Sequence, residues 1–232
     1  MKNTYIVIPA LKPGPELAGE VRELGRRLCA RIVLVDDGSG PDYQKTFSMA
    51  ERVEGCRVLH HRKNLGKGRA LKTGFAYIKG QLLEEKALIL CMDCDGQHLP
   101  ADGAGLLLLA ERWPGSLILG VRDFSGAGVP LRSRLGNRIA SRALCLASGI
   151  RIRDTQTGLR AFDSSLLERF LEVPGEGFDY EMAMLLACAR EGVPVRTRKI
   201  RTVYVKGNAR SHFRPLTDSL LVLTACLRRE RS

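Results

Sequence analysis

The most informative stretch of this sequence is Leu88-Ile-Leu-Cys-Met-Asp-Cys-Asp-Gly-Gln-His-Leu-Pro100, in which an apolar run of strand length ends at two carboxylates, Asp93 and Asp95. A strand that is apolar on both faces is typical of the buried middle of a parallel sheet. Open sheets of this kind bind ligands beyond the carboxyl ends of their strands. The stretch therefore predicts a parallel sheet with a ligand site at the end of this strand.

The residues after this strand predict a metal site. Asp93, Asp95 and the side-chain amide of Gln97 form a compact set of oxygen ligands suited to Mg²⁺ or Mn²⁺. These ions take only one or two protein carboxylates and fill their other positions with substrate phosphates and water, so a metal diphosphate is the expected ligand. The alternative is a solvated turn, because Asp, Gly and Pro are ordinary turn residues. We expect His98 to support the site rather than to ligate the metal.

Length and composition indicate one large cytoplasmic domain. The 232 residues suffice for a sizeable core, and no interdomain linker or internal repeat is visible. Seven cysteines, odd in number and mostly inside apolar segments, indicate reduced thiols. No signal peptide pattern opens the sequence, and the apolar runs are far shorter than the ~20 residues that cross a bilayer. We expect a soluble protein or one that is peripheral on the cytoplasmic face of the membrane.

The formal net charge of +12 indicates an anionic partner, which is nucleic acid, an anionic membrane surface or a phosphorylated substrate. Between Arg122 and Arg160, eight arginines stand against two acids, Asp123 and Asp154. Neither a nucleic-acid binding motif nor interleaved aromatic residues accompany them. We therefore expect phosphorylated substrates and a membrane surface as partners, and no nucleic acid.

The first half of the chain alternates between strand and helix patterns. Tyr5 to Ile8, stopped by Pro9, and residues 31–35 are predicted strands, and the stripe of apolar residues in 16–28 predicts a helix between them. This spacing is typical of βαβ units and predicts right-handed crossovers. Further expected elements are a weak helix at 41–52, a strand at 56–60, a helix after 68, a helix at 102–113, a strand at 117–121, a mobile loop at 126–130, an edge strand ending near 162, a helix from 177, a basic strand at 193–205 and a last helix at 213–227.

Polar residues also follow other strands. Asp36 and Asp37 close the second strand, where they cap the following helix or hydrogen-bond the base and ribose of a nucleotide. Lys67 lies between two glycines at a helix start, and free amides at such a start favour anions. The alternative for this second motif is a glycine-rich turn followed by a basic, solvated helix face.

Two later helices have apolar stripes with basic residues beside them. One helix carries arginines four residues apart, which therefore share a face, and we expect its apolar residues to form the buried side. The arginines are Arg134, Arg138 and Arg142, and the apolar residues are Leu135, Ile139, Ala143 and Leu146. These arginines either bind phosphate in bidentate pairs or form a solvated face. The last helix is either docked on the domain or lies on a membrane.

Six motifs, in this order, resemble family 2 glycosyltransferases, in particular dolichyl-phosphate mannose synthases and bacterial polyprenyl-phosphate sugar transferases. They are Ile-Val-Ile-Pro, Val-Asp-Asp-Gly-Ser, Asn-x-Gly-Lys-Gly-x-Ala-Leu, Asp-x-Asp-Gly-Gln-His, Asp-Thr-Gln-Thr-Gly-Leu-Arg and Phe-Asp-Tyr-Glu-Met. The resemblance implies an α/β GT-A fold, Rossmann-like, with a mostly parallel twisted sheet flanked by helices on both faces. It implies one such domain over residues 1–232, with an amphipathic helix and basic tail at 213–232.

The resemblance also implies the reaction and the roles of the candidate residues. The donor is a nucleoside-diphosphate sugar of the UDP-glucose or GDP-mannose type, Mg²⁺ or Mn²⁺ is the cofactor, and the anomeric carbon is inverted. We assign nucleotide-sugar binding to Pro9, Asp36, Asp37, Lys67 and Asp93, metal binding to Asp93, Asp95 and Gln97, acceptor or phosphate binding to Arg134, Arg138 and Arg160, and catalysis to Asp154, Arg122 and Glu181. Some relatives carry a membrane-spanning tail that this chain lacks, so we expect attachment through the basic face, the last helix or a separate small membrane protein.

Three functions remain open at this point. The first is sugar transfer to a polyprenyl phosphate of the undecaprenyl or dolichyl type. The second is transfer to a saccharide or lipid hydroxyl in cell-envelope glycan synthesis, and the third is a nonenzymatic basic binding module. A phosphate monoester, with a second pKa of about 6, is largely dianionic at neutral pH and needs no strong general base. A hydroxyl acceptor needs such a base, for which Asp154 is the first candidate and Glu181 the second. The alternative is that Asp154 caps a turn and that Glu181 is an acid in the first turn of a helix.

Overall fold

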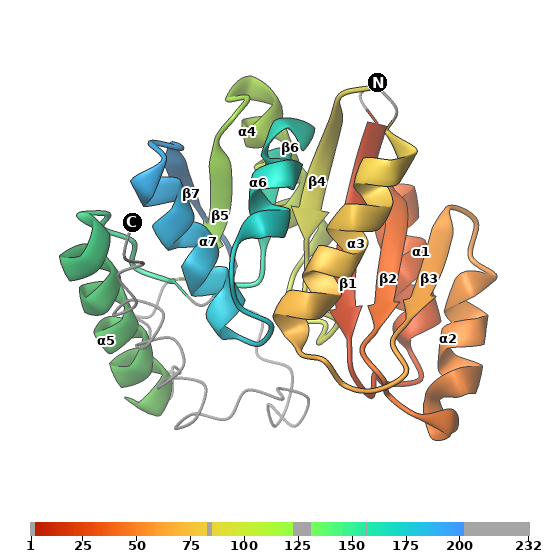
Figure 1. Ribbon diagram of the computed structural model, residues 1–232. Helices are drawn as coiled ribbons and strands as arrows, with labels where there is room; N and C mark the ends of the chain where they lie inside the picture. The colour runs from red at the N-terminus through yellow and green to blue at the C-terminus, as the bar shows by residue number, and fades with distance from the viewer. Residues whose placement is uncertain (1–2, 83–84, 123–130, 156, 202–232) are drawn as a thin grey trace.

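Seven strands of the described residues form one sheet in the order β3-β2-β1-β4-β6-β5-β7 (Figure 1). The computed structural model describes residues 3–82, 85–122, 131–155 and 157–201, without the side chains of 131–136. The strands are β1 (Asn3–Ala10), β2 (Arg31–Asp36), β3 (Cys56–His60), β4 (Ala87–Cys91), β5 (Leu117–Val121), β6 (Arg160–Asp163) and β7 (Val195–Lys199). β6 is antiparallel to its neighbours β4 and β5, and the other pairs are parallel. The predicted mostly parallel sheet is confirmed.

Helices cover both faces of this sheet (Figure 1). One apolar core lies between the sheet and α1 (Leu17–Leu28), α2 (Gln44–Glu51) and α4 (Pro100–Arg112). The other core lies between the sheet and α3 (Lys67–Gln81), α5 (Leu131–Ser148), α6 (Leu167–Glu172) and α7 (Asp179–Arg190). Two short 3-10 helices, η1 (Pro41–Tyr43) and η2 (Ser164–Leu166), precede α2 and α6.

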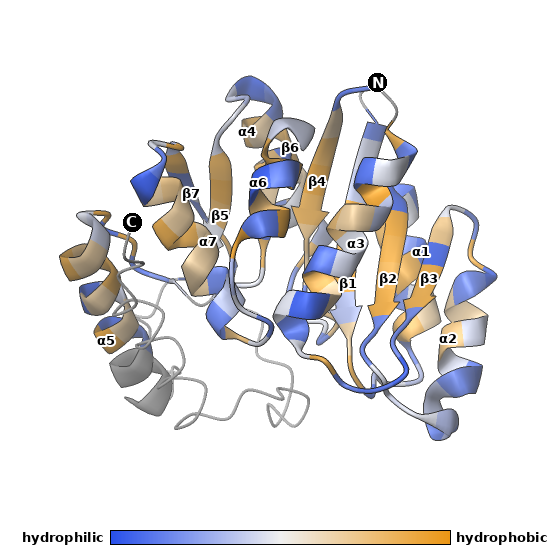
Figure 2. Cartoon of the chain, viewed as in Figure 1, coloured by the Kyte–Doolittle hydropathy of each residue, from blue (hydrophilic) through white to orange (hydrophobic). Residues whose placement is uncertain are grey.

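Alternation along the strands explains why the sheet has two cores. Tyr5 and Val7 of β1 belong to the core under α3, whereas Ile6 and Ile8 belong to the core under α1. β4 and β5 are buried at every position, as expected for interior strands with helices on both sides. Figure 2 shows these two strands mostly in hydrophobic colours.

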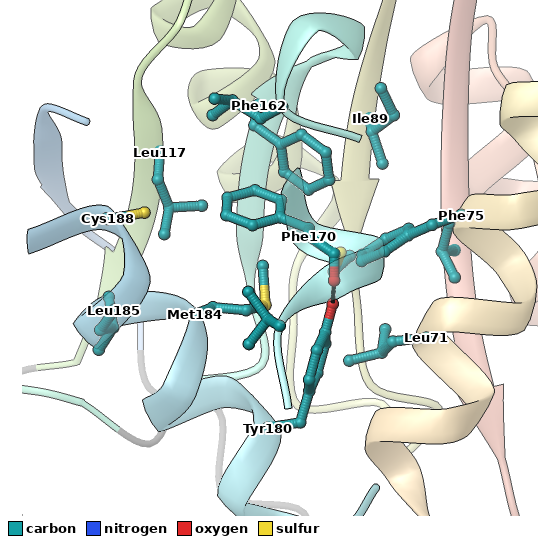
Figure 3. Close-up of a cluster of buried hydrophobic side chains, with 14 of the residues drawn as sticks. Leu71, Phe75, Ile89, Leu117, Phe162, Phe170, Tyr180, Met184, Leu185 and Cys188 are labelled. Carbon is teal, nitrogen blue, oxygen red and sulfur yellow. Dashed lines mark hydrogen bonds between the residues drawn. The ribbon is translucent and has the colours of Figure 1, made fainter. Parts of the chain in front are cut away.

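An aromatic core holds α3, α6 and α7 together. The ring of Phe162 on β6 packs edge-on against Phe75 at 5.4 Å and Phe170 at 4.8 Å between ring centroids. The Tyr180 hydroxyl donates a hydrogen bond of 2.5 Å to the Phe170 carbonyl, as Figure 3 shows. Because α3 and α7 both begin at the edge of the sheet to which β1 and β4 point (Figure 1), this core fixes the positions of their first turns.

Two strands differ from the prediction. β1 continues through Pro9, which pairs with Val35 of β2, instead of stopping before it. Its pairing with β4 ends at Val7, so the absent N–H of Pro9 removes no hydrogen bond with that strand. β6 is an interior strand rather than an edge strand, because it pairs with β4 on one side and β5 on the other.

α5 exposes the side that the apolar periodicity predicted to be buried. Ile139 is 46% exposed and Leu146 90% exposed, although we predicted both on the buried side. The buried residues in the described part of this helix are Asn137, Ala140 and Leu144. The predicted orientation of α5 is therefore wrong.

Two polar side chains fix the observed orientation of α5. Asn137 donates to the carbonyl of Arg153 and accepts the N–H of Thr155 at 3.2 Å. Ser141 donates to the carbonyl of Ile152. These bonds satisfy backbone groups of the segment that follows the helix, and a helix rotated to bury Leu146 would lose them.

Several predicted segments fall outside the described residues. They are the loop at 126–130, the last helix at 213–227 and the tail to residue 232. Of the basic strand predicted at 193–205, β7 accounts for Val195–Lys199.

Candidate active site

The candidate residues gather where the parallel strands end. Asp36 is the last residue of β2, Asp93 follows β4 directly after Met92, and Arg122 follows β5. Lys67 is the first residue of α3. The structure thus brings side chains from three strand ends and one helix start to the same edge of the sheet.

Lys67 joins two carboxylates at the centre of this edge. Its ammonium lies 2.8 Å from Asp93 Oδ1 and 2.9 Å from Glu181 Oε2. Burial opposes the charge of Lys67, but Asp93 and then Glu181 outweigh this effect and raise the pKa of Lys67 above its ordinary value. The contact links α3, the loop after β4 and α7 by one cation whose side chain is 12% exposed.

The pKa values of the two aspartates after β4 are shifted in opposite directions. Burial opposes the charge of Asp93, but the Lys67 ammonium and then His98 outweigh it and hold the pKa of Asp93 well below its usual range. Burial and the nearby charge of Asp93 raise the pKa of Asp95. Asp95 also accepts the backbone N–H of Gln97 at 3.0 Å. Negative charge at Asp95 is therefore only partly compensated by the protein.

This imbalance suits a divalent cation. A metal held by Asp93 and Asp95 would relieve the repulsion that raises the pKa of Asp95, and the donors are the hard oxygens that Mg²⁺ and Mn²⁺ prefer. Within the described residues, no group of three or more His, Cys, Asp or Glu side chains could by itself hold an ion. An ion bound by Asp93 and Asp95 would therefore take its further ligands from a substrate or from water.

His98 lies beside the predicted metal ligands. Its Nε2 is 3.7 Å from Asp93 Oδ2, and its side chain is buried. Its Nδ1 has no hydrogen-bond partner among the described residues. The imidazole thus contributes to the field around Asp93, in line with the expected supporting role.

Asp37 anchors the loop that leads to Lys67. Its carboxylate accepts the backbone N–H groups of Leu65 and Gly66 at 2.9 Å each, and it lies 2.7 Å from Nδ1 of His61. The other ring nitrogen of His61 lies 2.9 Å from the hydroxyl of Thr73 on α3. The role of Asp37 in nucleotide binding stays a prediction, and the structure adds that Asp37 orders the neighbouring loop.

Asp36 makes a smaller set of contacts. It accepts the backbone N–H of Ser39 at 2.9 Å and lies 3.0 Å from Nδ1 of His60. The helix that follows, η1, starts after Gly40 without a side-chain cap. The alternative that Asp36 or Asp37 caps the next helix is therefore wrong.

The glycines around Lys67 allow two helix starts to approach each other. Gly66 has φ +101°, and a Cβ there would lie 2.4 Å from the carbonyl oxygen of Glu176. A Cβ on Gly68 would lie 2.5 Å from Cβ of Tyr180. The N–H of Gly68 donates to the carbonyl of Gly177 at 3.2 Å. The expectation of free amides at this helix start is therefore wrong at Gly68, because the start of α7 occupies the space beside it.

Asp154 holds Arg122 by a bidentate ion pair. Nε of Arg122 donates to Oδ2 of Asp154 at 2.8 Å, and a terminal nitrogen donates to Oδ1 at 3.2 Å. Asp154 is 0% exposed, and it also accepts the backbone N–H of Arg122 at 3.1 Å. Burial opposes the charge of Arg122, but Asp154 outweighs it and raises the pKa of Arg122. The geometry holds Asp154 against Arg122, and the catalytic role of Asp154 stays a prediction.

Arg160 is a structural residue. It is 1% exposed, and its guanidinium donates to the carbonyls of Thr157 at 3.0 Å, Glu181 at 2.7 Å and Thr155 at 3.3 Å. These bonds fasten the segment after Asp154 to α7. In this structure the guanidinium is enclosed and directed at backbone carbonyls, and the phosphate contact of Arg160 stays a prediction.

Glu181 lies between two cations. Besides its contact with Lys67, its Oε1 is 3.7 Å from Nε of Arg160, and the residue is buried. This carboxylate anchors Lys67, and its catalytic assignment stays a prediction.

The remaining candidates have simpler surroundings. Arg138 is exposed on α5, and the side chain of Arg134 lies outside the described residues. Pro9 lies in β1 at the same edge of the sheet as Asp36. The structure therefore supplies no contact that would define a ligand for any of these three residues.

Sequence reasoning missed two residues of this edge. His61 orients Asp37, and the only available signal was its place directly after a short predicted strand. Glu20 of α1 lies near the loop after β4, where burial and then the charges of Asp95 and Glu23 raise the pKa of Glu20. Nothing in the spacing along the chain relates Glu20 to Asp95, because α1 and β4 belong to different sequence segments.

Comparisons with known proteins agree with this architecture. The sequence profile described as Glycosyl transferase family 2 matches residues 5–171. The uncharacterized protein MJ1222 of Methanocaldococcus jannaschii is 28% identical over 208 residues, which cover 87% of this chain and 82% of the relative.

Two further relatives carry names that state an activity. The UDP-N-acetylglucosamine–dolichyl-phosphate N-acetylglucosaminyltransferase of Methanococcus voltae is 26% identical over 226 residues, covering 88% of this chain and 87% of the relative. An undecaprenyl-phosphate 4-deoxy-4-formamido-L-arabinose transferase of Pseudomonas paraeruginosa is 30% identical over 174 residues, covering 73% of this chain and 47% of the relative. With its mixed sheet, its acids at the strand ends and the family profile over most of its length, the chain belongs to glycosyl transferase family 2 and is a glycosyltransferase with a GT-A fold.

Proposed function

We propose that this glycosyltransferase moves a sugar from a nucleoside-diphosphate sugar to a polyprenyl phosphate, with inversion at the anomeric carbon. The single observation that carries the choice of acceptor is the enclosure of both candidate bases. Asp154 is paired with Arg122, and Glu181 lies between Lys67 and Arg160. A phosphate acceptor, already dianionic at neutral pH, needs neither carboxylate as a base.

The charges at the strand ends suit the two phosphorylated substrates. Asp93 and Asp95 would hold Mg²⁺ or Mn²⁺, which supplies charge neutralisation for the departing diphosphate when it is bound. Arg122 is partly exposed and fixed by Asp154, so its cation is oriented in advance. The names of the relatives from Methanococcus voltae and Pseudomonas paraeruginosa support a polyprenyl phosphate as the acceptor class.

The proposed reaction is a single displacement. A phosphate oxygen of the acceptor attacks the anomeric carbon from the face opposite the diphosphate and forms a new C–O bond. The bond between the anomeric carbon and the diphosphate oxygen breaks, and the nucleoside diphosphate leaves with the electron pair. No proton has to be removed from the dianionic acceptor. Asp37 and Pro9 would contribute to nucleotide binding, and Arg138 and Arg134 to binding of the acceptor phosphate.

A donor and acceptor screen tests this proposal. The purified chain is incubated with UDP- and GDP-sugars, Mg²⁺ or Mn²⁺, and either a polyprenyl phosphate, the matching prenyl alcohol or an oligosaccharide. We expect sugar on the phosphate only, with inverted anomeric configuration by NMR, and loss of turnover in Asp95→Ala or with a chelator. Transfer to an alcohol or saccharide hydroxyl would replace this proposal with the second candidate function, and equal turnover by Asp95→Ala would remove the metal assignment.

A further inference from the structure

The outward side of α5 combines apolar and cationic residues. We name Arg138, Ile139, Arg142 and Leu146 the α5 outer face. All four side chains are exposed, and Leu146 is 90% exposed. Ile139 and Leu146 are two turns apart on one side of the helix, or about 10 Å along its axis. An exposed leucine and isoleucine flanked by arginines are typical of a helix that lies in a lipid interface.

The charge around this face has one sign. Residues 131–153 contain six arginines and no acid: Arg132, Arg134, Arg138, Arg142, Arg151 and Arg153. An ordinary solvated helix face mixes both signs of charge, so a purely cationic face indicates an anionic counterpart. The long apolar stems of arginine also suit a position where the charged group reaches headgroups while the stem stays in the apolar layer.

The orientation of the face is built into the fold. Asn137 and Ser141 on the opposite side of the helix are bonded to backbone groups of Ile152, Arg153 and Thr155. Exposure of Leu146 is therefore a consequence of specific hydrogen bonds.

From these observations we infer that the α5 outer face lies on the surface of an anionic phospholipid bilayer. A second copy of the chain fits less well, because a twofold contact would place the same arginines opposite each other. Residues 202–232 of this chain also fit less well, since they carry six basic residues against two acids, Asp218 and Glu230. No helix of the described residues is long and apolar enough to cross a membrane.

This contact would place the proposed reaction at the membrane surface. Asn137 holds the backbone on both sides of Asp154, and Asp154 holds Arg122. A bilayer under α5 is therefore connected to Arg122 through a short series of hydrogen bonds. This part of the inference rests on the proposed function, because it assumes an acceptor phosphate at headgroup level.

Vesicle binding by the full chain tests the inference. Vesicles of phosphatidylcholine, with and without phosphatidylglycerol, are sedimented with wild type, Leu146→Asp, Arg142→Gln and the matched control Leu108→Asp. Leu108 is 67% exposed on α4, which packs on the other face of the sheet. We expect binding only to anionic vesicles, at least tenfold weaker partitioning for Leu146→Asp, and unchanged partitioning for Leu108→Asp. Arg142→Gln should weaken partitioning about fivefold, which corresponds to ~1 kcal/mol per basic side chain at an anionic surface.

Three results would overturn the inference: no binding of wild type to anionic vesicles, equal binding to neutral vesicles, or equal losses in Leu146→Asp and Leu108→Asp. A fourth result would also overturn it: if light scattering shows that the wild type is a dimer and that Leu146→Asp dissociates it, the α5 outer face is an interface between copies.

Transfer to a short-chain, water-soluble prenyl phosphate separates this test from the proposed function. We expect equal rates on it for wild type and Leu146→Asp, whereas no transfer by wild type would refute the proposed function and leave the vesicle result valid.

Discussion

Replacing Lys67 by methionine should destabilise the fold and change its acid sensitivity. The substitution keeps most of the side-chain volume but leaves Asp93 and Glu181 without the ammonium that lies within 2.9 Å of both. Breaking a buried ion pair from one side costs about 3–5 kcal/mol. We expect about 3 kcal/mol, the lower end, because Asp93 is 27% exposed and Glu181 keeps Arg160 at 3.7 Å.

The pH dependence follows from the lowered pKa of Asp93. Its folded pKa lies below the unfolded value of about 3.9, so its contribution to stability is present above about pH 4 and is lost as the pH falls below that value. The raised pKa of Lys67 adds stability that persists up to about pH 10 and is lost above it. The stability difference between wild type and Lys67→Met should therefore be largest near neutral pH and shrink on acidification.

Urea unfolding followed by circular dichroism, at pH 7 and at intervals down to about pH 2.5, measures this difference. For a domain of this size, ~3 kcal/mol corresponds to about 6–12 °C in Tm. Lys67→Arg should recover part of the loss because it restores a cation, and Lys79→Met, which removes the cation of an exposed pair with Glu168, should behave as wild type. A Lys67→Met protein within 1 kcal/mol of wild type at pH 7, or a difference that does not vary with pH, would refute this reasoning.

Three further substitutions test the site residues. Asp154→Asn should lower stability by about 3 kcal/mol and reduce kcat for sugar transfer, because it releases Arg122. The pH–rate profile should keep all its ionisations, and the loss of one would indicate that Asp154 is the base. Arg160→Lys should lower the free energy of unfolding by about 2–4 kcal/mol in urea titrations, because lysine cannot reproduce the bonds to three carbonyls. A variant as stable as wild type would contradict the structural role. Gly66→Ala should lower Tm by at least the equivalent of ~2 kcal/mol, because a Cβ would meet the Glu176 carbonyl at a residue with positive φ. Gly80→Ala is the control and should not lower Tm, because there is open space around Gly80. Equal Tm values for the two variants would refute the close approach.

The sequence correctly predicted the features that depend on local pattern. The stretch from Ala87 is a fully buried strand, and its acids lie at the edge of the sheet where Lys67 also lies. These predictions hold because a strand buried on both faces needs an unbroken apolar run, and because parallel strands end at the same edge of a sheet. The residue types at the strand ends could therefore be placed near one another without knowing any contact.

The pairings among the charged residues could not be predicted in this way. Arg122 and Asp154 are 32 residues apart and Lys67 and Glu181 are 114 apart, and each acid had a plausible role on its own. Whether a carboxylate is a base or a counter-ion depends on which cation reaches it, and the packing of β5, β6 and α7 decides that.

Local pattern was enough to predict the strands and most of the helices along the chain, although not α6, and to predict the sheet edge that carries the polar residues. Hydrophobic periodicity and strand ends are local properties of the chain. The enclosure of Arg160 and the outward position of Leu146 depend on how distant segments pack together. The reason is that the position of a side chain depends on hydrogen bonds to backbone groups of distant segments as well as on the burial of apolar area. In α5, the hydrogen bonds of Asn137 and Ser141 outweighed the apolar stripe.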